Sequence, residues 1–210
     1  MGKQNDKHRE RARQATAGRT AVEKADAQVT AMVAPLRDTL TVRMTSAASE
    51  ILDQPPLVAL SAAVAVAGLA TRNARLARAG LRMLASHALA TLAKGAIKNR
   101  VDRSRPRKLL KDGDYAMEPG ESEDGDMRSF PSGHTAGGVA VVRALAREYP
   151  GSRGPAGAAL AAATAALIPK QAHYPSDIAA GTVIGWAAEA AVNLVWMRLE
   201  PHLPKGLATR

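Results

Sequence analysis

Residues 178–197 read IAAGTVIGWAAEAAVNLVWM, an apolar run that contains a single charged residue, Glu189. A helix needs about 20 mostly apolar residues to cross a membrane, so this run is long enough to span one. Four other apolar segments precede it and are shorter or carry charges: residues 55–71, 79–97, 133–146 and 154–169. The sequence lacks valine-rich alternating runs bounded by turn residues, which would indicate strands. We therefore predict an all-α fold, an antiparallel bundle of about five apolar helices.

The connections between these segments differ in charge, and this difference predicts a membrane orientation. Residues 72–82, residues 147–154 and the C-terminal tail are basic, and in a five-span bundle they all lie on one side. The positive-inside rule assigns such connections to the cytoplasmic face. Residues 98–132 and 170–177 fall on the opposite side. We expect a multi-pass cell-membrane protein with these residues on the non-cytoplasmic face; a soluble bundle with an alanine-rich core is the alternative.

The chain before the apolar segments divides into two parts. Residues 1–28 are highly charged and are typical of a basic polar tail that is mobile or is helical only in the context of the folded protein. In residues 29–52, apolar side chains recur at helical spacing, which predicts an amphipathic helix that lies at a lipid interface or packs on the protein surface. Residues 53–200 then hold the helical bundle, and residues 201–210 form a C-terminal tail.

The composition limits the chemistry. The chain has no cysteine, which excludes disulfides, thiolate metal sites and cysteine nucleophiles. Its formal net charge of +10 indicates an anionic partner: nucleic acid, acidic lipid headgroups or a phosphorylated substrate. Several of the positive charges fall within one short cluster, KNRVDRSRP at residues 98–106, and this concentration favours phosphate.

Two cations of this first cluster are spaced for a shared role. Lys98 and Arg105 are seven residues apart, about two helical turns, so on a helix they share a face. Pro106 then ends this helix. Arginine offers a planar fork for bidentate contact with phosphate, and lysine offers a point charge. We interpret the pair as an anion grip; a basic anchor at the membrane surface is the alternative.

A second cluster, PSGH at residues 131–134, stands where a polar loop becomes an apolar segment. Ser132 is a candidate N-cap for the helix that follows, where free backbone N–H groups favour an anion. Gly133 allows an oxyanion to approach the backbone closely. His134 is a candidate proton donor to a leaving oxygen. The alternative is an ordinary helix start with an exposed histidine.

A third cluster, HYPSD at residues 173–177, places His173 four residues before Asp177. We expect Asp177 to accept a hydrogen bond from one imidazole nitrogen, which fixes the tautomer and leaves the other nitrogen free to attack phosphorus. A helix N-cap at Ser176 or Asp177 is the other interpretation, and the two are compatible. In an antiparallel bundle all three clusters meet at one end.

The three clusters together resemble the type-2 phosphatidic acid phosphatase superfamily, which includes lipid phosphate phosphatases and vanadium haloperoxidases. The resemblance covers about residues 55–198. It implies that His173, oriented by Asp177, attacks the phosphoryl group and forms a phosphohistidine, and that His134 is the general acid. It implies that the phosphate oxygens are held by Lys98, Arg105, Ser132 and Gly133. The phosphatase reaction of this family needs no metal and no other cofactor.

The third motif departs from the family pattern. It usually opens with Ser-Arg, and Ala166 and Leu167 stand at those positions, so one phosphate-binding cation is missing. Lys170 lies three residues further on and is expected to reach the same oxygens if the helix continues, although Pro169 interrupts the geometry. The missing cation lowers the rate by about 100-fold where nothing replaces it. A slower enzyme, an altered specificity and an inactive relative are the outcomes that this departure leaves open.

The resemblance thus implies a membrane phosphatase that hydrolyses a lipid phosphomonoester or diphosphate, such as a phosphatidate, phosphatidylglycerol phosphate or polyprenyl diphosphate. The expected partners are this substrate and the membrane, with the active site on the non-cytoplasmic face. A vanadium haloperoxidase-like enzyme is one alternative, and a non-catalytic basic protein that binds membranes or nucleic acid is another. No named nucleic-acid motif appears, so no nucleic-acid partner is expected. The sequence does not indicate an oligomeric state.

Overall fold

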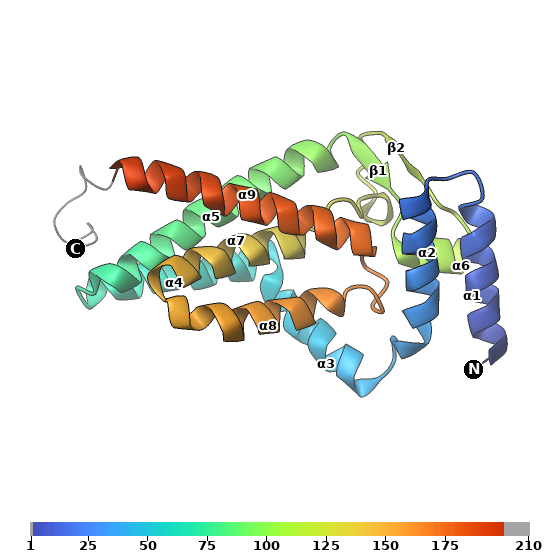
Figure 1. Ribbon diagram of the computed structural model, residues 1–210, viewed down its shortest axis with the longest axis horizontal. Helices are drawn as coiled ribbons and strands as arrows, with labels where there is room; N and C mark the ends of the chain where they lie inside the picture. The colour runs from blue at the N-terminus through green and yellow to red at the C-terminus, as the bar shows by residue number, and fades with distance from the viewer. Residues whose placement is uncertain (1, 200–210) are drawn as a thin grey trace. The chain divides into compact units, whose positions relative to one another are not determined.

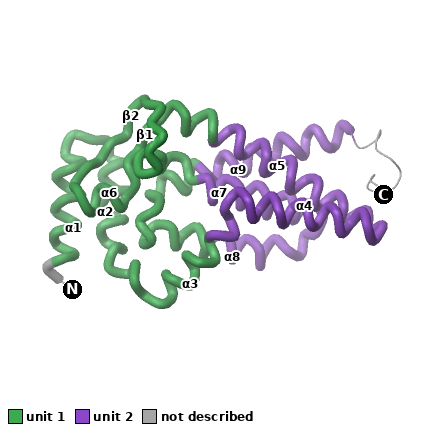
Figure 2. The backbone as a smooth tube through the Cα atoms, turned by 180° about the vertical axis from the view of Figure 1, so that it is seen from behind, with its two compact units in different colours: residues 1–49, 95–132, 162–180 green, residues 50–94, 133–161, 181–210 purple. Residues whose placement is uncertain are grey.

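The computed structural model describes residues 2–199, which are mostly helical, as the all-α prediction requires (Figure 1). The one sheet in this range has two short strands. The chain divides into two compact units (Figure 2). Unit 1 comprises residues 1–49, 95–132 and 162–180, and unit 2 comprises residues 50–94, 133–161 and 181–210.

Unit 1 holds the N-terminal helices and the loops that carry most of the predicted site. Its elements are α1 (Gly2–Ala15), α2 (Ala21–Val33), the 3-10 turn η1 (Ala34–Leu36), α3 (Leu40–Ser49), β1 (Val101–Arg103), α6 (Pro106–Asp112), β2 (Met117–Pro119) and the 3-10 turn η3 (Gly125–Met127). Helix α1 lies beside α2, and both contact α6 (Figure 1). Strands β1 and β2 are antiparallel, with Asp102 opposite Glu118.

Most of residues 2–28 are helical, which agrees with the alternative that this charged segment forms helices in the context of the folded protein. Alanine side chains at positions 12 and 27 are fully buried in the core of unit 1. A capping box begins α2: the Thr20 hydroxyl accepts a hydrogen bond from the backbone N–H of Glu23, whose carboxylate accepts one from the backbone N–H of Thr20. Small apolar residues therefore give this charged segment a packed face.

The single amphipathic helix predicted for residues 29–52 is not present. Helix α2 ends at Val33, the turn η1 follows, and α3 begins only at Leu40. Pro35 explains the break, since a proline has no backbone N–H to donate and its ring clashes with the preceding turn of an α-helix. The exposed apolar side chains of this region lie on both sides of the break: Met32, Leu36, Leu40 and Met44.

Unit 2 is built from the predicted apolar segments. Its elements are the 3-10 turn η2 (Glu50–Leu52), α4 (Gln54–Ala70), α5 (Ala74–Lys98), α7 (Gly133–Glu148), the 3-10 turn η4 (Pro150–Ser152), α8 (Arg153–Ala165) and α9 (Pro175–Leu199). By these bounds α5, α8 and α9 also contribute residues to unit 1. A Cβ atom on Gly185 of α9 would lie 2.4 Å from the carbonyl oxygen of Ala136 on α7. Small residues thus allow these two helix backbones to approach closely.

Among the described residues one helix, Pro175–Leu199, is long and apolar enough to cross a membrane. A second span is possible only if Leu40–Leu52 and Gln54–Ala70, which meet at a bend, together form one broken span. The five predicted spans therefore lack support from length and composition. Only 22% of the apolar window in α9 is buried. The charged residue in the middle of this helix, Glu189, is 1% exposed and forms ion pairs with Arg143 and Arg147.

The approach of α4 and α5 gives a stability prediction. A Cβ on Gly80 would lie 2.2 Å from the backbone nitrogen of Ala65, so Gly80→Ala must push the two helices apart. We expect the free energy of unfolding to fall by about 1–3 kcal/mol, the usual cost of overpacking. Gly95→Ala, on the same helix but with nothing within 4 Å of the new Cβ, should be neutral or stabilising. Thermal unfolding followed by circular dichroism checks this, and equal melting temperatures for the two variants would contradict it.

Candidate active site

The imidazole of His173 is buried, with 1% of its surface exposed, in the loop that precedes α9. Its Nδ1 atom lies 2.9 Å from the backbone carbonyl oxygen of Ser129 and 3.6 Å from Oδ2 of Asp177. The shorter distance is a hydrogen bond and the longer one is not. Because a carbonyl oxygen only accepts, Nδ1 carries the proton, and Nε2 keeps its lone pair.

This geometry corrects one detail of the sequence interpretation. The Ser129 carbonyl at 2.9 Å is the nearer acceptor of the Nδ1–H, and Oδ2 of Asp177, the expected acceptor, lies 3.6 Å from the same nitrogen and acts on the ring by its charge. A backbone group therefore sets the tautomer that the sequence interpretation attributes to Asp177.

Asp177 itself is fully buried and has several donors. Its Oδ2 accepts from the Ser129 hydroxyl at 2.5 Å and from the backbone N–H of Tyr174 at 2.8 Å. Its Oδ1 accepts from Nη1 of Arg103 at 2.6 Å. Helix α9 begins at Pro175, so neither Ser176 nor Asp177 is the predicted N-cap. Asp177 lies in the first turn, where a carboxylate is favoured by the helix dipole and by free N–H groups.

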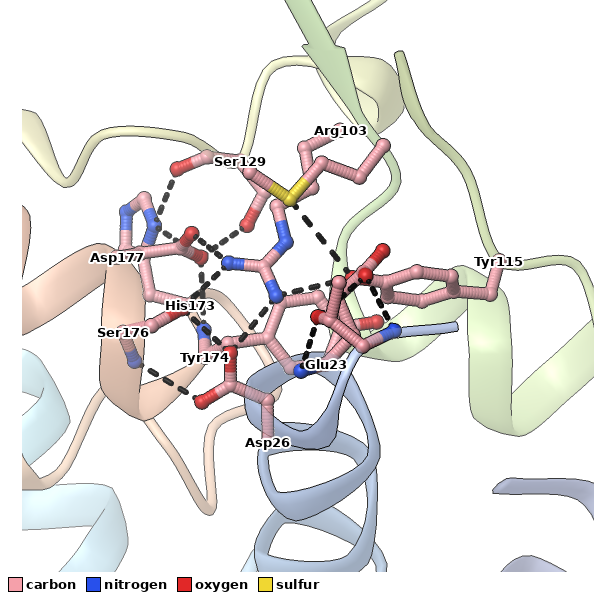
Figure 3. Close-up of polar contacts among 11 residues, drawn as sticks. Glu23, Asp26, Arg103, Tyr115, Ser129, His173, Tyr174, Ser176 and Asp177 are labelled. Carbon is pink, nitrogen blue, oxygen red and sulfur yellow. Dashed lines mark hydrogen bonds and ion pairs between the residues drawn. The ribbon is translucent and has the colours of Figure 1, made fainter. Parts of the chain in front are cut away.

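Arg103, at the end of β1, is the largest fully buried side chain of the described residues, and the sequence interpretation missed it (Figure 3). Its Nη1 donates to Asp177 and to the Ser176 hydroxyl at 2.7 Å, and its Nη2 donates to Asp26 at 2.8 Å. The guanidinium also lies 4.3 Å from the ring centroid of Tyr174. In the sequence, Arg103 is one of several arginines in a basic cluster, and nothing local marks it as buried.

The protonation states around Arg103 follow from its neighbours. Burial lowers the pKa of Arg103, but the charges of Asp177 and Asp26 outweigh this effect and raise its pKa overall. Burial raises the pKa of Tyr115 to about 12, although Arg103 opposes the change. At neutral pH the arginine is therefore charged, and the tyrosine hydroxyl accepts a hydrogen bond from Nη2 at 3.1 Å as a neutral group.

The two cations of the first cluster are not on one helix, which corrects the prediction of a shared helical face. Helix α5 ends at Lys98, strand β1 follows, and Arg105 is at the N-cap position of α6. The residue before a proline is disfavoured in the α conformation, so Arg105, before Pro106, is extended. The Nε atom of Arg105 donates to the carbonyl oxygen of Gly125 at 2.8 Å.

Both cations nevertheless act on the histidine. Burial lowers the pKa of His173 most, the carboxylate of Asp177 raises it, and the positive charges of Arg105 and Lys98 lower it further. The net result is a pKa below the ordinary value of 6.5. The first and third clusters of the sequence thus belong to one unit, where the cations lie close enough to His173 to influence its charge.

The second cluster begins a helix, because α7 starts at Gly133, directly after Ser132. Ser132 is fully buried, and its backbone N–H donates to the carbonyl oxygen of Asp177 at 3.1 Å. Gly133 and His134 follow in the chain and belong to unit 2. There, Nζ of Lys94 lies 2.9 Å from the position that a Cβ on Gly133 would occupy. An ammonium group therefore approaches the first residue of α7, and the motifs in the sequence predict no role for it.

A family model described as the PAP2 superfamily matches residues 79–200, more than half of the chain. The chain belongs to this superfamily. The match includes all three motifs and leaves out α1 to α4. No curated protein and no solved structure matches the chain significantly. Members of the PAP2 superfamily are phosphatases, which supports a phosphoric ester hydrolase activity.

The departure from the PAP2 pattern has a structural role. Leu167, at the position of the expected arginine, is fully buried. Its carbonyl oxygen accepts the backbone N–H groups of Ala172 at 3.0 Å and of His173 at 3.3 Å, so this residue shapes the turn that leads to the histidine. Helix α8 ends at Ala165 and does not continue to Lys170. The condition for the expected reach of Lys170, a helix that continues to this residue, is therefore not met.

Proposed function

We propose that this PAP2 protein is a membrane-associated phosphatase that hydrolyses a lipid phosphomonoester or diphosphate through a phosphohistidine on His173. The observation that carries the proposal is the histidine itself: its Nδ1–H is tied to the Ser129 carbonyl, and its buried Nε2 keeps a lone pair. A neutral imidazole with a fixed tautomer beside two cations is suited to attack an anionic phosphoryl group.

In the proposed reaction, Nε2 of His173 forms a bond to phosphorus while the bond from phosphorus to the leaving oxygen breaks. His134 gives a proton to that oxygen. The ring then carries a positive charge, which the carboxylate of Asp177 stabilises. Water attacks the phosphohistidine in the second step, breaks the P–N bond and releases inorganic phosphate. His134 takes the proton from this water and returns to its starting state.

The phosphate oxygens need cations and N–H donors throughout. We assign this role to Lys98 and Arg105, which already act electrostatically on the nucleophile, and to the start of α7. At that start, Gly133 supplies its backbone N–H and Ser132 its hydroxyl, where the helix dipole favours an anion. Lys170 and Lys94 are the two candidates to replace the missing arginine of the third motif.

The exposed apolar side chains of the helices support a lipid tail as part of the substrate. Helix α9 has apolar side chains that the rest of the chain leaves exposed: Val183, Trp186, Leu194, Val195 and Met197. Glu189, the acidic residue that lies between these apolar residues in the sequence, is buried and forms ion pairs with Arg143 and Arg147. This surface and the net charge of +10 suit contact with an anionic membrane. The proposed location of the site, on the non-cytoplasmic face, rests on the basic connections alone.

A phosphate-release screen tests the function. The purified protein in detergent is offered phosphatidate, phosphatidylglycerol phosphate, a polyprenyl diphosphate and a water-soluble phosphomonoester. We expect release from at least one lipid substrate, with a higher kcat/KM than for the soluble ester, because the tail binds to apolar helices. Release from none of them overturns the proposal. Halide oxidation that depends on added vanadate would identify a haloperoxidase-like enzyme instead.

The replacement cation can be identified by single variants. We expect Lys94→Met to lower kcat/KM for the best lipid substrate by about 100-fold, because one preorganised cation in a phosphate site stabilises the transition state by roughly 3 kcal/mol. We expect a smaller loss for Lys170→Met, since the Lys94 ammonium lies beside Gly133, the first residue of α7. Lys111→Met, which removes an exposed charge on α6, controls for net charge. The reverse order of losses would assign the role to Lys170.

The pH dependence follows from the lowered pKa of His173. The nucleophile must be unprotonated, so activity is lost only when the pH falls through the pKa of the folded protein. We expect the acid limb of kcat/KM to lie below pH 6.5. An acid limb above pH 6.5 would contradict the assignment.

The same lowered pKa of His173 has a consequence for stability. As the pH falls, the unfolded chain takes up a proton on this histidine before the folded protein does, so its contribution to stability is complete above pH 6.5 and is lost below it.

A further inference from the structure

Asp26 lies on α2, outside residues 79–200 that match the PAP2 model, and yet it contacts the buried residues beside His173 (Figure 3). Its carboxylate is 4% exposed. Oδ2 accepts from Nη2 of Arg103 at 2.8 Å, and Oδ1 accepts from the backbone N–H of Ser176 at 3.0 Å. The hydroxyl of Ser176 donates to the same carboxylate. A helix beyond the family match thus holds the start of α9.

The charges of this cluster do not cancel. Two buried carboxylates, Asp26 and Asp177, share the single guanidinium of Arg103, which leaves one excess negative charge. Buried charges are screened less than exposed ones, so this excess acts on neighbouring groups. Asp177 presents Oδ2 to the imidazole of His173 at 3.6 Å. If Asp26 were neutral, the arginine would balance Asp177 alone, and the excess negative charge would be lost.

We propose that Asp26 is a positioning residue of the phosphatase reaction, which acts through Arg103 and Ser176 on Asp177 and His173. This rests on the proposed function. When Nε2 bonds to phosphorus, the ring becomes positive, and the excess negative charge stabilises it. Helix α2, through Asp26, is therefore part of the catalytic unit rather than an accessory segment.

Asp26→Asn tests the proposal, since it removes the charge and keeps the shape. The groups that face His173 are Asp177 from α9, Arg105 before α6 and Lys98 at the end of α5, and all remain. We expect kcat to fall by roughly tenfold or more, as for the loss of about one pKa unit of charge stabilisation, with a much smaller change in KM. The acid limb of kcat/KM moves to lower pH, because a positive ring is less favoured. Asp26→Glu, which restores the charge, should recover part of both changes.

A matched control lies on the same helix. Thr30 is fully buried one turn after Asp26, and its hydroxyl has no hydrogen-bond partner among the described residues. Thr30→Val should leave kcat and the pH profile unchanged. Should Asp26→Asn fail to fold, Ser176→Ala removes only the bridging hydroxyl and should shift both readouts less, in the same direction. An unchanged kcat and pH profile in the Asp26 or Ser176 variants, or an equal fall in Thr30→Val, overturns the proposal.

A second readout separates this proposal from the proposed function. The imidazole of His173 in ¹⁵N-labelled protein is titrated by NMR, which needs no substrate. We expect its pKa to be lower in Asp26→Asn than in the wild type and in Thr30→Val. If the wild type releases no phosphate from any lipid, the proposed function fails, and this titration still decides whether Asp26 acts on His173. Equal pKa values in all three proteins overturn the coupling.

Discussion

His173→Asn is expected to lower phosphate release by at least about 1000-fold, because it removes the proposed nucleophile of the proposed two-step reaction. Asparagine is the appropriate replacement. Its side-chain amide donates a hydrogen bond close to the position of Nδ1, so the contact with the Ser129 carbonyl can be kept while Nε2 is lost. The buried carbonyl then keeps its partner, and any loss of activity reports on chemistry rather than on folding.

The covalent intermediate gives this prediction a second measurement. Wild-type protein denatured during turnover of a ³²P-labelled lipid phosphate should carry a label that is stable to base and labile to acid, as expected for phosphohistidine. His173→Asn should carry none. His8→Asn, a change on α1 outside the site, should label and turn over like the wild type. Full activity or normal labelling in His173→Asn would exclude the mechanism.

The sequence predicts local features of the candidate site better than it predicts what surrounds them. Motif spacing selects His173 and Asp177 as candidates, which lie close together in the structure, and α7 starts directly after Ser132, the position of the candidate N-cap. These predictions depend on local patterns, in which each residue is read with its close neighbours. The predicted sharing of a helical face by Lys98 and Arg105 fails, because spacing alone does not distinguish a helix from a strand followed by a turn.

The residues that the sequence interpretation missed are those held by distant partners. Arg103 meets Asp26 and Asp177 at separations of 77 and 74 residues, and a single sequence carries no sign of such pairs. The same holds for α1 and α2, whose charged composition indicates a tail. Their packed face consists of alanines, such as Ala12 and Ala27, that contribute little to a hydrophobic pattern. In both cases, the burial of Arg103 and the packing of α1 and α2 depend on contacts between residues that are far apart in the sequence.

Arg103→Met is expected to have the largest effect on stability. The guanidinium is fully buried and is the shared ion-pair partner of two buried carboxylates, so its removal takes this partner from both Asp26 and Asp177. Breaking a buried ion pair by removing one partner costs about 3–5 kcal/mol. For a chain of this size we expect the melting temperature to fall by roughly 10 °C, with loss of activity at temperatures where the wild type is active.

A double variant shows whether the cost comes from unpaired charge or from lost packing. Adding Asp26→Asn to Arg103→Met removes one of the two stranded carboxylates, so the double variant should be more stable than Arg103→Met alone. Arg100→Met provides the control, because the side chain of this exposed arginine of the same cluster donates to the backbone carbonyl oxygen of Ala96 in the last turn of α5 and to no buried carboxylate of the described residues. It should melt close to the wild type.

If Arg103→Met melts like Arg100→Met, the guanidinium does not hold the carboxylates together. If the double variant is no more stable than Arg103→Met, the cost arises from packing of the arginine against Tyr174 and not from its charge.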